Sequence, residues 1–135
     1  MDDIKIALDA INLYQTQYSQ VDKIWGYFSV VTLAIAGFVI GSDKSTRSLK
    51  EPCAIVAAYI IFCIGNHKAL VAGQEQLEQF SIIAINLANT AKLDVSALQP
   101  ITHEWVGYFH LSVIFAVCIG IMTVAWLRQK SHKKE

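Results

Sequence analysis

Residues 24–41, IWGYFSVVTLAIAGFVIG, decide the fold class, because they contain no acidic or basic side chain. A helix rises 1.5 Å per residue, so a hydrocarbon core of about 30 Å needs about 20 such residues. Two further stretches have the same character. Residues 105–127 hold one ionisable side chain, His110, and residues 53–73 are apolar except for three strongly polar side chains. The sequence therefore predicts an all-α membrane protein with three transmembrane helices.

The composition of the whole chain agrees with membrane insertion. Of its 135 residues, 54% are hydrophobic and 16% are charged, whereas a soluble domain carries about 25% charged residues. Eleven basic residues balance eleven acidic ones, which argues against a nucleic-acid partner. The Walker, GxGxxG, HExxH and GxSxG signatures do not occur, and the three cysteines lack CxxC spacing. We therefore expect neither an enzyme nor a metal site.

The segments that flank the spans also have a helical pattern. Apolar residues recur every three or four positions in residues 1–23 and 74–91, which predicts that the first two helices extend beyond the bilayer as amphipathic helices. These outer parts either pack against each other or lie flat in the membrane interface, and the acidic polar face of 74–91 favours packing. The expected organisation of a single domain, 1–135, is an amphipathic helix (1–23), a first span (24–41), a short basic loop (42–52), a second span (53–73), an amphipathic helix (74–91), a connector (92–104), a third span (105–127) and a basic tail (128–135).

The charges of the flanking segments predict the orientation. Residues 42–52 and 128–135 carry seven basic side chains, whereas the longer segments 1–23 and 74–104 carry three. By the positive-inside rule, the N-terminus lies outside and the C-terminus lies in the cytoplasm, as in a protein of a bacterial inner membrane. The first span follows an acidic segment and lacks a cleavage pattern, so it is not expected to be a signal peptide.

Small residues four positions apart occur in every span. This spacing lets the backbones of membrane helices approach closely, which is one way in which they associate in lipid. We expect these residues to pack helices together, either within one chain or between subunits. They are Gly37, Gly41, Ala54, Ala58, Gly65, Ala116 and Gly120.

The polar side chains of the second span are the most informative feature for function. Counting the helical rise from each span boundary places His67 and His110 at similar depths, about 9 Å and about 8 Å below the outer edge of the hydrocarbon core. A lysine at the centre of a membrane helix costs at least about 2.5 kcal/mol, so such residues usually have a function or a partner. The candidate site is a polar vestibule open to the outside, lined by Asn66, His67, Lys68, His110 and Glu104.

Three other interpretations of the same residues remain open. In the first, Lys68 reaches up to water and His67 bonds to a neighbouring carbonyl, so that the residues only anchor the helix. In the second, they form a buried polar network. In the third, His67 and His110 are the axial ligands of a haem b between two spans, in a small redox subunit. Apart from that haem, no cofactor is expected.

Three spans, an outside N-terminus and the short basic tail RQKSHKKE at 128–135 resemble the layout of three-span phage holins. The resemblance covers topology and implies a homo-oligomeric, pore-forming bundle that has the lipid bilayer and further copies of itself as partners. The two long outer helices depart from the holin layout and suit a rigid assembly. The size and layout are also similar to those of small membrane effectors and immunity proteins of bacterial conflict systems. That likeness implies an accessory or immunity-type subunit that binds another membrane protein.

Overall fold

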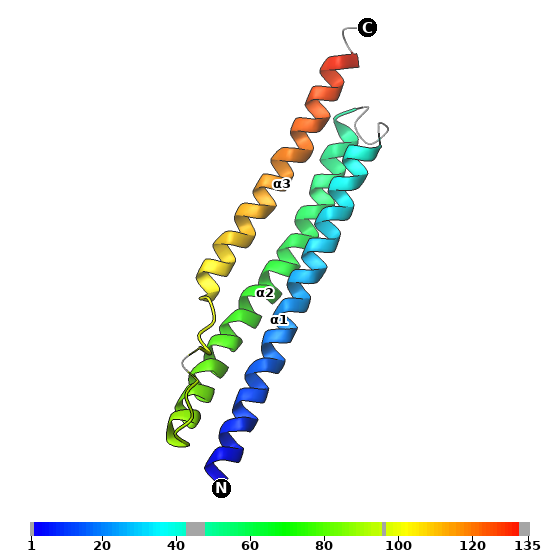
Figure 1. Ribbon diagram of the computed structural model, residues 1–135. Helices are drawn as coiled ribbons and strands as arrows, with labels where there is room; N and C mark the ends of the chain where they lie inside the picture. Colours follow the sequence, from blue (N-terminus) through cyan, green and yellow to red (C-terminus); the bar gives the residue numbers. More distant parts are fainter. Residues whose placement is uncertain (1, 43–47, 96, 133–135) are drawn as a thin grey trace. The chain divides into compact units, whose positions relative to one another are not determined.

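The computed structural model describes residues 2–42, 48–95 and 97–132. It contains three long helices, α1 (Asp2–Gly41), α2 (Lys50–Thr90) and α3 (His103–His132), and no strand within these ranges (Figure 1). Each helix is long and apolar enough to cross a membrane. The expected all-α protein with three membrane-crossing helices is confirmed. Since α1 and α2 have 40 and 41 residues, each is about twice the length that one crossing needs.

The third helix continues further than the sequence pattern indicates. Arg128 and Lys130 were expected in a basic tail, but α3 includes both and ends at His132. Arg, Gln and Lys are good helix formers, and no Pro or Gly follows Gly120 to stop the helix. Lys50 of the predicted loop is the first residue of α2, and the other basic residues of the predicted loop and tail, Lys44, Arg47, Lys133 and Lys134, lie outside the described residues.

Local side-chain and backbone bonds fix both ends of α2. At its start, the Ser48 backbone N–H donates to the Glu51 carboxylate, and the Ser48 hydroxyl bonds to the same carboxylate, as in a capping box. At its end, Lys92 adopts a positive φ of 58°. The Leu93 N–H donates to the Ala88 carbonyl at 2.8 Å, which closes the helix in a Schellman motif.

By its contacts the chain divides into two compact units. The first unit comprises Met1–Trp25 and Lys68–Tyr108, and the second comprises Gly26–His67 and Phe109–Glu135. The two units contain different parts of the same long helices, and each has its own interior.

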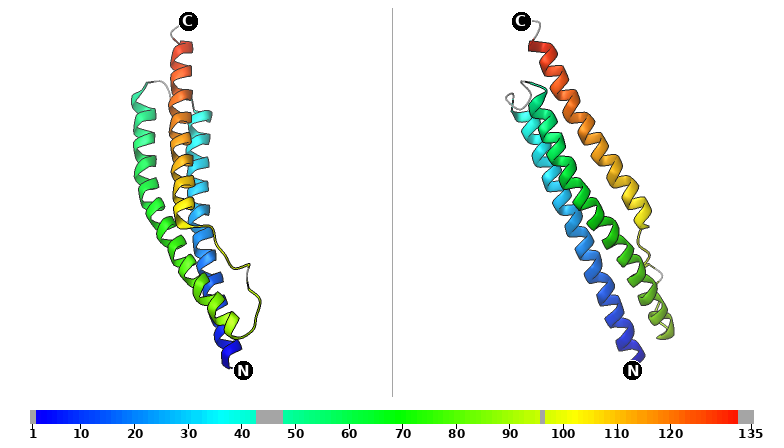
Figure 2. Two further views of the ribbon diagram at one scale, coloured as in Figure 1. Left: turned by 90° about the vertical axis from the view of Figure 1, so that its left-hand side faces the viewer. Right: turned by 180° about the vertical axis from the view of Figure 1, so that it is seen from behind.

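In the first unit, the N-terminal part of α1 pairs with the C-terminal part of α2 (Figures 1 and 2). Tyr14, Leu77 and Ala84 form one core cluster. At Gly73 the side chains of α1 lie close to α2, since an added Cβ would lie 3.3 Å from Cγ2 of Val21. The outer helices therefore pack against each other, and Gly73 leaves room for the side chains of α1.

The connector between α2 and α3 is held against α2 by three polar side chains. Gln74 donates to the Ile101 carbonyl at 2.6 Å, Ser81 donates to the Leu98 carbonyl, and Glu78 accepts the backbone N–H of His103. Gln74, Glu78 and Ser81 are spaced i, i+4 and i+7, so they share one face of α2. Figure 2 shows the connector running back along the helix pair from the end of α2.

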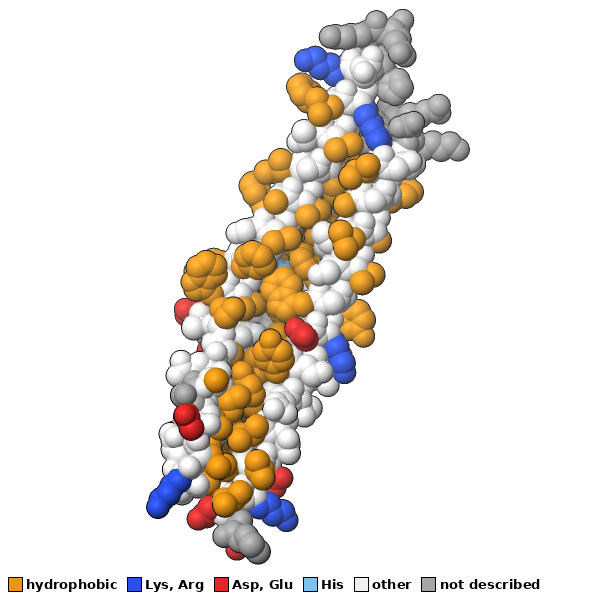
Figure 3. Space-filling view, in the orientation of Figure 1, with side chains coloured by type: hydrophobic (Ala, Val, Ile, Leu, Met, Phe, Trp, Pro, Cys, Tyr) orange, Lys and Arg blue, Asp and Glu red, His pale blue; other side chains and the backbone are white. Residues whose placement is uncertain are grey.

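In the second unit, the C-terminal part of α1, the N-terminal part of α2 and most of α3 form a three-helix bundle (Figures 1 and 2). The buried side chains Val39, Tyr59 and Ile121 come from the three different helices. On the face shown in Figure 3, most of the coloured side chains of this unit are hydrophobic, and the Lys and Arg side chains visible on it lie at its upper end. Such a surface suits a hydrocarbon environment.

Four of the five buried residues of α1, all except Val39, recur every seven positions. They are Ala7, Tyr14, Val21 and Phe28, which is the 3.5-residue period of a coiled-coil seam. The apolar side chains of Ile4, Leu8 and Tyr18, which continue the same three- and four-residue spacing, are 46–53% exposed.

Candidate functional site

The centre of the candidate site is His110 on α3. Its side chain is completely buried, with an exposed fraction of 0%. The Phe28 ring of α1 packs on one side with its centroid 4.2 Å from that of His110. On the other side lie Asn66 and His67 of α2, both partly buried. All four residues belong to the second unit, so each of its three helices contributes to the contact.

Hydrogen bonds join His110 to both α2 residues. Asn66 Nδ2 lies 3.2 Å from His110 Nε2, and His67 Nδ1 lies 3.2 Å from His110 Nδ1. With the Asn66 amide in this orientation, its N–H donates to Nε2 of His110. Neutral His110 then carries its proton on Nδ1 and donates it to Nδ1 of His67. The tautomers follow from this network of donors and acceptors, and every ring nitrogen of His110 has a partner.

Lys68 and Glu104, the other two predicted vestibule residues, lie in the first unit and have exposed side chains. Successive residues on a helix are 100° apart, so Lys68 points away from the face that contacts His110. Within one chain, the structure brings together three of the five predicted residues. That contact is closed around His110.

A haem does not fit between these histidines in the observed arrangement. Two axial imidazoles must face each other across the iron and the flat macrocycle. Here the rings of His67 and His110 touch each other directly, with a nitrogen–nitrogen distance of 3.2 Å and centroids 5.3 Å apart. The Phe28 ring occupies another face of His110. No step of the function is therefore assigned to a haem.

The seven small residues expected at helix contacts lie on the outside of the chain. All of them are exposed, and a Cβ added at Gly37, Gly41, Gly65 or Gly120 would meet nothing within 4 Å. The alternative that these glycines bring helices together within one chain does not agree with this geometry. The alternative of contacts between subunits remains.

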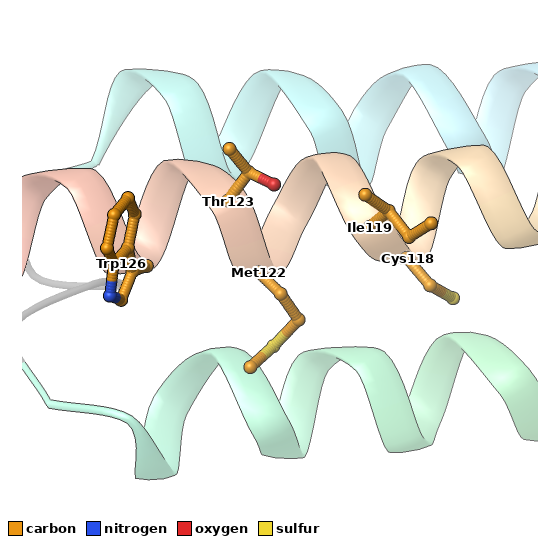
Figure 4. Close-up of a pocket in the computed structure, with 5 residues that line it drawn as sticks. All are labelled: Cys118, Ile119, Met122, Thr123 and Trp126. Carbon is orange, nitrogen blue, oxygen red and sulfur yellow. The ribbon is translucent and has the colours of Figure 1, made fainter.

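The bundle of the second unit has apolar grooves beside α3. One groove of about 160 Å³ runs between α1 and α3, with Ala36 and Gly120 among its lining residues. A second depression lies along α3 itself, and Figure 4 shows its five lining residues, with Met122 extending toward α2. Cys118, Ile119, Met122, Thr123 and Trp126 line it. These grooves are shaped for hydrocarbon groups and offer few polar atoms.

Sequence reasoning missed two polar contacts in the second unit. Arg128 of α3 donates to three carbonyls at the end of α1, those of Val39 at 2.9 Å, Ile40 at 2.6 Å and Ser42 at 3.3 Å. The Thr32 and Tyr59 hydroxyls lie 2.9 Å apart, and Tyr59 is fully buried. Arg128 satisfies helix-end carbonyls that have no partner inside α1. Since the partners of Arg128 are backbone atoms, no motif of side chains predicts this contact.

No protein family, characterised protein or solved structure matches this chain.

Proposed function

We propose that this chain is a non-enzymatic membrane protein of a bacterial inner membrane that acts by assembling its transmembrane helices with those of further copies. The observation that carries this proposal is the groove between α1 and α3. Gly120 is exposed at this groove and has open space around its Cα, and Gly37 is equally open on α1. Small residues with nothing packed on them allow a helix of another chain to come close.

The polar residues have a place in such an assembly. Lys68 is exposed, and Asn66 and His67 are partly buried, so these three side chains are available to a water-filled space between subunits. Buried His110 holds two of them in position. A vestibule between subunits lowers the cost of the Lys68 charge, because water keeps an ammonium group solvated. A pore is the extension of this proposal in which that space crosses the membrane.

Leucine substitutions at the open glycines test the assembly. Gly120→Leu and Gly37→Leu each place a bulky side chain where a neighbouring helix is expected. Overpacking costs about 1–3 kcal/mol, so we expect the oligomer to dissociate at protein concentrations at which the unchanged protein stays associated. Light scattering or native mass spectrometry in a maltoside detergent measures the mass of the complex.

Gly26→Leu is the matched control. Gly26 is also exposed and open. It lies eleven residues, about 16 Å, along α1 from Gly37, which is adjacent to the groove residue Ala36, so the Gly26→Leu variant should keep the mass of the parent protein. A monomeric parent protein contradicts self-assembly and favours an accessory subunit that binds a different membrane protein. If Gly120→Leu and Gly37→Leu form complexes of the same mass as Gly26→Leu and the parent protein, the proposed interface is contradicted.

The proposed orientation gives a separate prediction. In a background that lacks Cys53, Cys63 and Cys118, a cysteine introduced at Gln15 should react with a membrane-impermeant maleimide in intact cells. A cysteine at Ser45 should react only after the membrane is opened, because the basic loop is expected in the cytoplasm. Gel shift of the labelled protein measures both reactions. The opposite labelling pattern contradicts an outside N-terminus.

A further inference from the structure

The first unit contains a cavity beside the paired helices α1 and α2. The cavity has a volume of about 330 Å³ and lies between α1, α2 and the connector, a size typical of small-molecule sites. It belongs to the first unit alone, so it is separate from the groove and from the histidine contact described above. Residues of α1, α2, the connector and the first turn of α3 line it.

One wall of the cavity is aromatic. Tyr14, Tyr18 and Trp25 of α1 all line it, and their spacing of four and seven residues places them along one face of the helix. The Tyr14 and Tyr18 rings are adjacent, with centroids 6.4 Å apart and planes tilted by 40°. Aromatic faces carry negative electrostatic potential and attract a cation placed against them.

A carboxylate lies on the same wall. Asp22 lines the cavity and is exposed to solvent. Among the residues that the structure describes, none forms a hydrogen bond or ion pair with the Asp22 carboxylate. The sequence of the first unit contains eight acidic residues and four lysines, so the surrounding charge also favours a cation.

The rest of the lining selects the kind of cation. Val21, Leu77 and Val106 are buried apolar side chains, which suit a weakly hydrated group and disfavour a small inorganic ion with a tight water shell. The connector forms the opposite wall, and the Gln74 bond to the Ile101 carbonyl at 2.6 Å holds it in place. The cavity is therefore formed before any ligand arrives.

We propose that this cavity binds a quaternary ammonium group, with Tyr14, Tyr18 and Trp25 against its methyl groups and Asp22 as its counter-ion. The chemistry fits a choline headgroup of a lipid and a free choline-like solute equally well. A lipid headgroup has access because Trp25 and Val106 lie within two residues of the predicted membrane boundaries at 24 and 105.

Choline titration in a maltoside detergent tests the proposal. A Trp105→Phe, Trp126→Phe background leaves Trp25 as the fluorescent reporter, since the chain has three tryptophans. We expect saturable change of the Trp25 emission with choline. The neutral isostere 3,3-dimethylbutan-1-ol should bind at least tenfold more weakly, because it has the same shape without the charge. Equal binding of the two compounds overturns the proposal and leaves an apolar cavity only.

Matched variants locate the binding. Asp22→Asn and Tyr18→Leu should each weaken choline binding about fivefold or more, since each removes one attraction to the cation. Asp9→Asn changes another exposed acid of α1 outside the cavity and should leave the affinity unchanged. Circular dichroism of each variant verifies folding. Unchanged affinity in both cavity variants, with folding intact, places the choline elsewhere and overturns the proposal.

Lipid nanodiscs separate the two sources of the ligand. If the headgroup occupies the cavity, free choline should bind more weakly in phosphatidylcholine nanodiscs than in phosphatidylglycerol nanodiscs. Equal affinity in both lipids assigns the site to a soluble cation. Because the site lies within one chain, it does not depend on self-assembly, and a monomer that binds choline supports this inference while it contradicts the proposed oligomer.

Discussion

Replacing Arg128 by leucine should lower the free energy of unfolding by about 2 kcal/mol. The guanidinium group donates to the carbonyls of Val39, Ile40 and Ser42. A hydrogen bond that involves a charged group contributes about 1.5–3 kcal/mol to stability. The charge also lies at the C-terminal end of α1, where a cation is favourable. A detergent unfolding titration of the Arg128→Leu variant, followed by circular dichroism, measures the loss.

Two further variants make the comparison specific. Lys130→Leu removes an exposed cation from the same turn of α3. The Lys130 ammonium lies 5.2 Å from the centre of the Trp126 ring, an interaction worth about 0.5–1 kcal/mol at an exposed site. Arg128→Lys keeps the charge but has no planar fork to reach several carbonyls, so its stability should fall between the parent and Arg128→Leu. Equal losses for Arg128→Leu and Lys130→Leu contradict a specific role for the guanidinium group.

The number of the helices and the approximate length of the first two could be predicted, because hydrophobicity and helical rise accumulate residue by residue along the chain. The absence of charge over 24–41, and the single ionisable residue in 105–127, determine which segments can enter hydrocarbon. Distance along a helix axis is equally regular, at 1.5 Å per residue. Counts from the span boundaries therefore place His67 and His110 at similar depths, and the structure brings their side chains into contact.

The direction in which a helix face points could not be predicted in the same way. Gly37 and Gly120 have the spacing of packing residues in the sequence, yet both face outward in the single chain. The glycine with another helix packed against it is Gly73 instead, where the Val21 side chain lies close. Spacing shows which residues share a face, but contacts of the whole bundle decide whether that face lies inside.

Contacts to backbone atoms leave still less trace in a sequence. In the sequence, Arg128 is one of several basic residues expected in the cytoplasm. Its neighbouring residues do not indicate that it bonds to the Val39 carbonyl. The polar residues that hold the connector do have a detectable pattern. Gln74 and Ser81 alternate with the buried Leu70, Leu77 and Ala84 at steps of three and four residues, so polar groups interrupt the apolar face of α2. Such an interruption indicates that a polar backbone segment covers the face.

Replacing His110 by alanine should cause the largest loss of stability in the chain, about 3 kcal/mol. The imidazole is completely buried, so truncation leaves a cavity in the bundle, and comparable large-to-small changes cost about 2–5 kcal/mol. It also removes the hydrogen-bond partner of Asn66 and His67. The same detergent titration measures this loss in the second unit, where all four contacting residues lie.

His110→Phe separates the two contributions. Phenylalanine fills most of the volume and packs against Phe28, but it offers no polar atom to Asn66 or His67. Because hydrogen bonds between membrane helices average about 0.6 kcal/mol, this variant should lose much less stability than His110→Ala. If both variants lose the same amount, the hydrogen bonds account for the effect and packing does not.

Lys68→Leu is the control that distinguishes a buried contact from an exposed polar lining. Lys68 is exposed, and leucine extends the apolar part of the second span, so this variant should be as stable as the parent or more stable. If His110 lined only an open, water-filled space, His110→Ala would likewise leave the stability unchanged. The contrast between a destabilised His110→Ala and an unaffected Lys68→Leu therefore assigns His110 to the interior of the bundle and leaves Lys68 free to act in the assembly. Near-parent stability for His110→Ala contradicts that assignment, because a fully packed imidazole cannot be removed without cost.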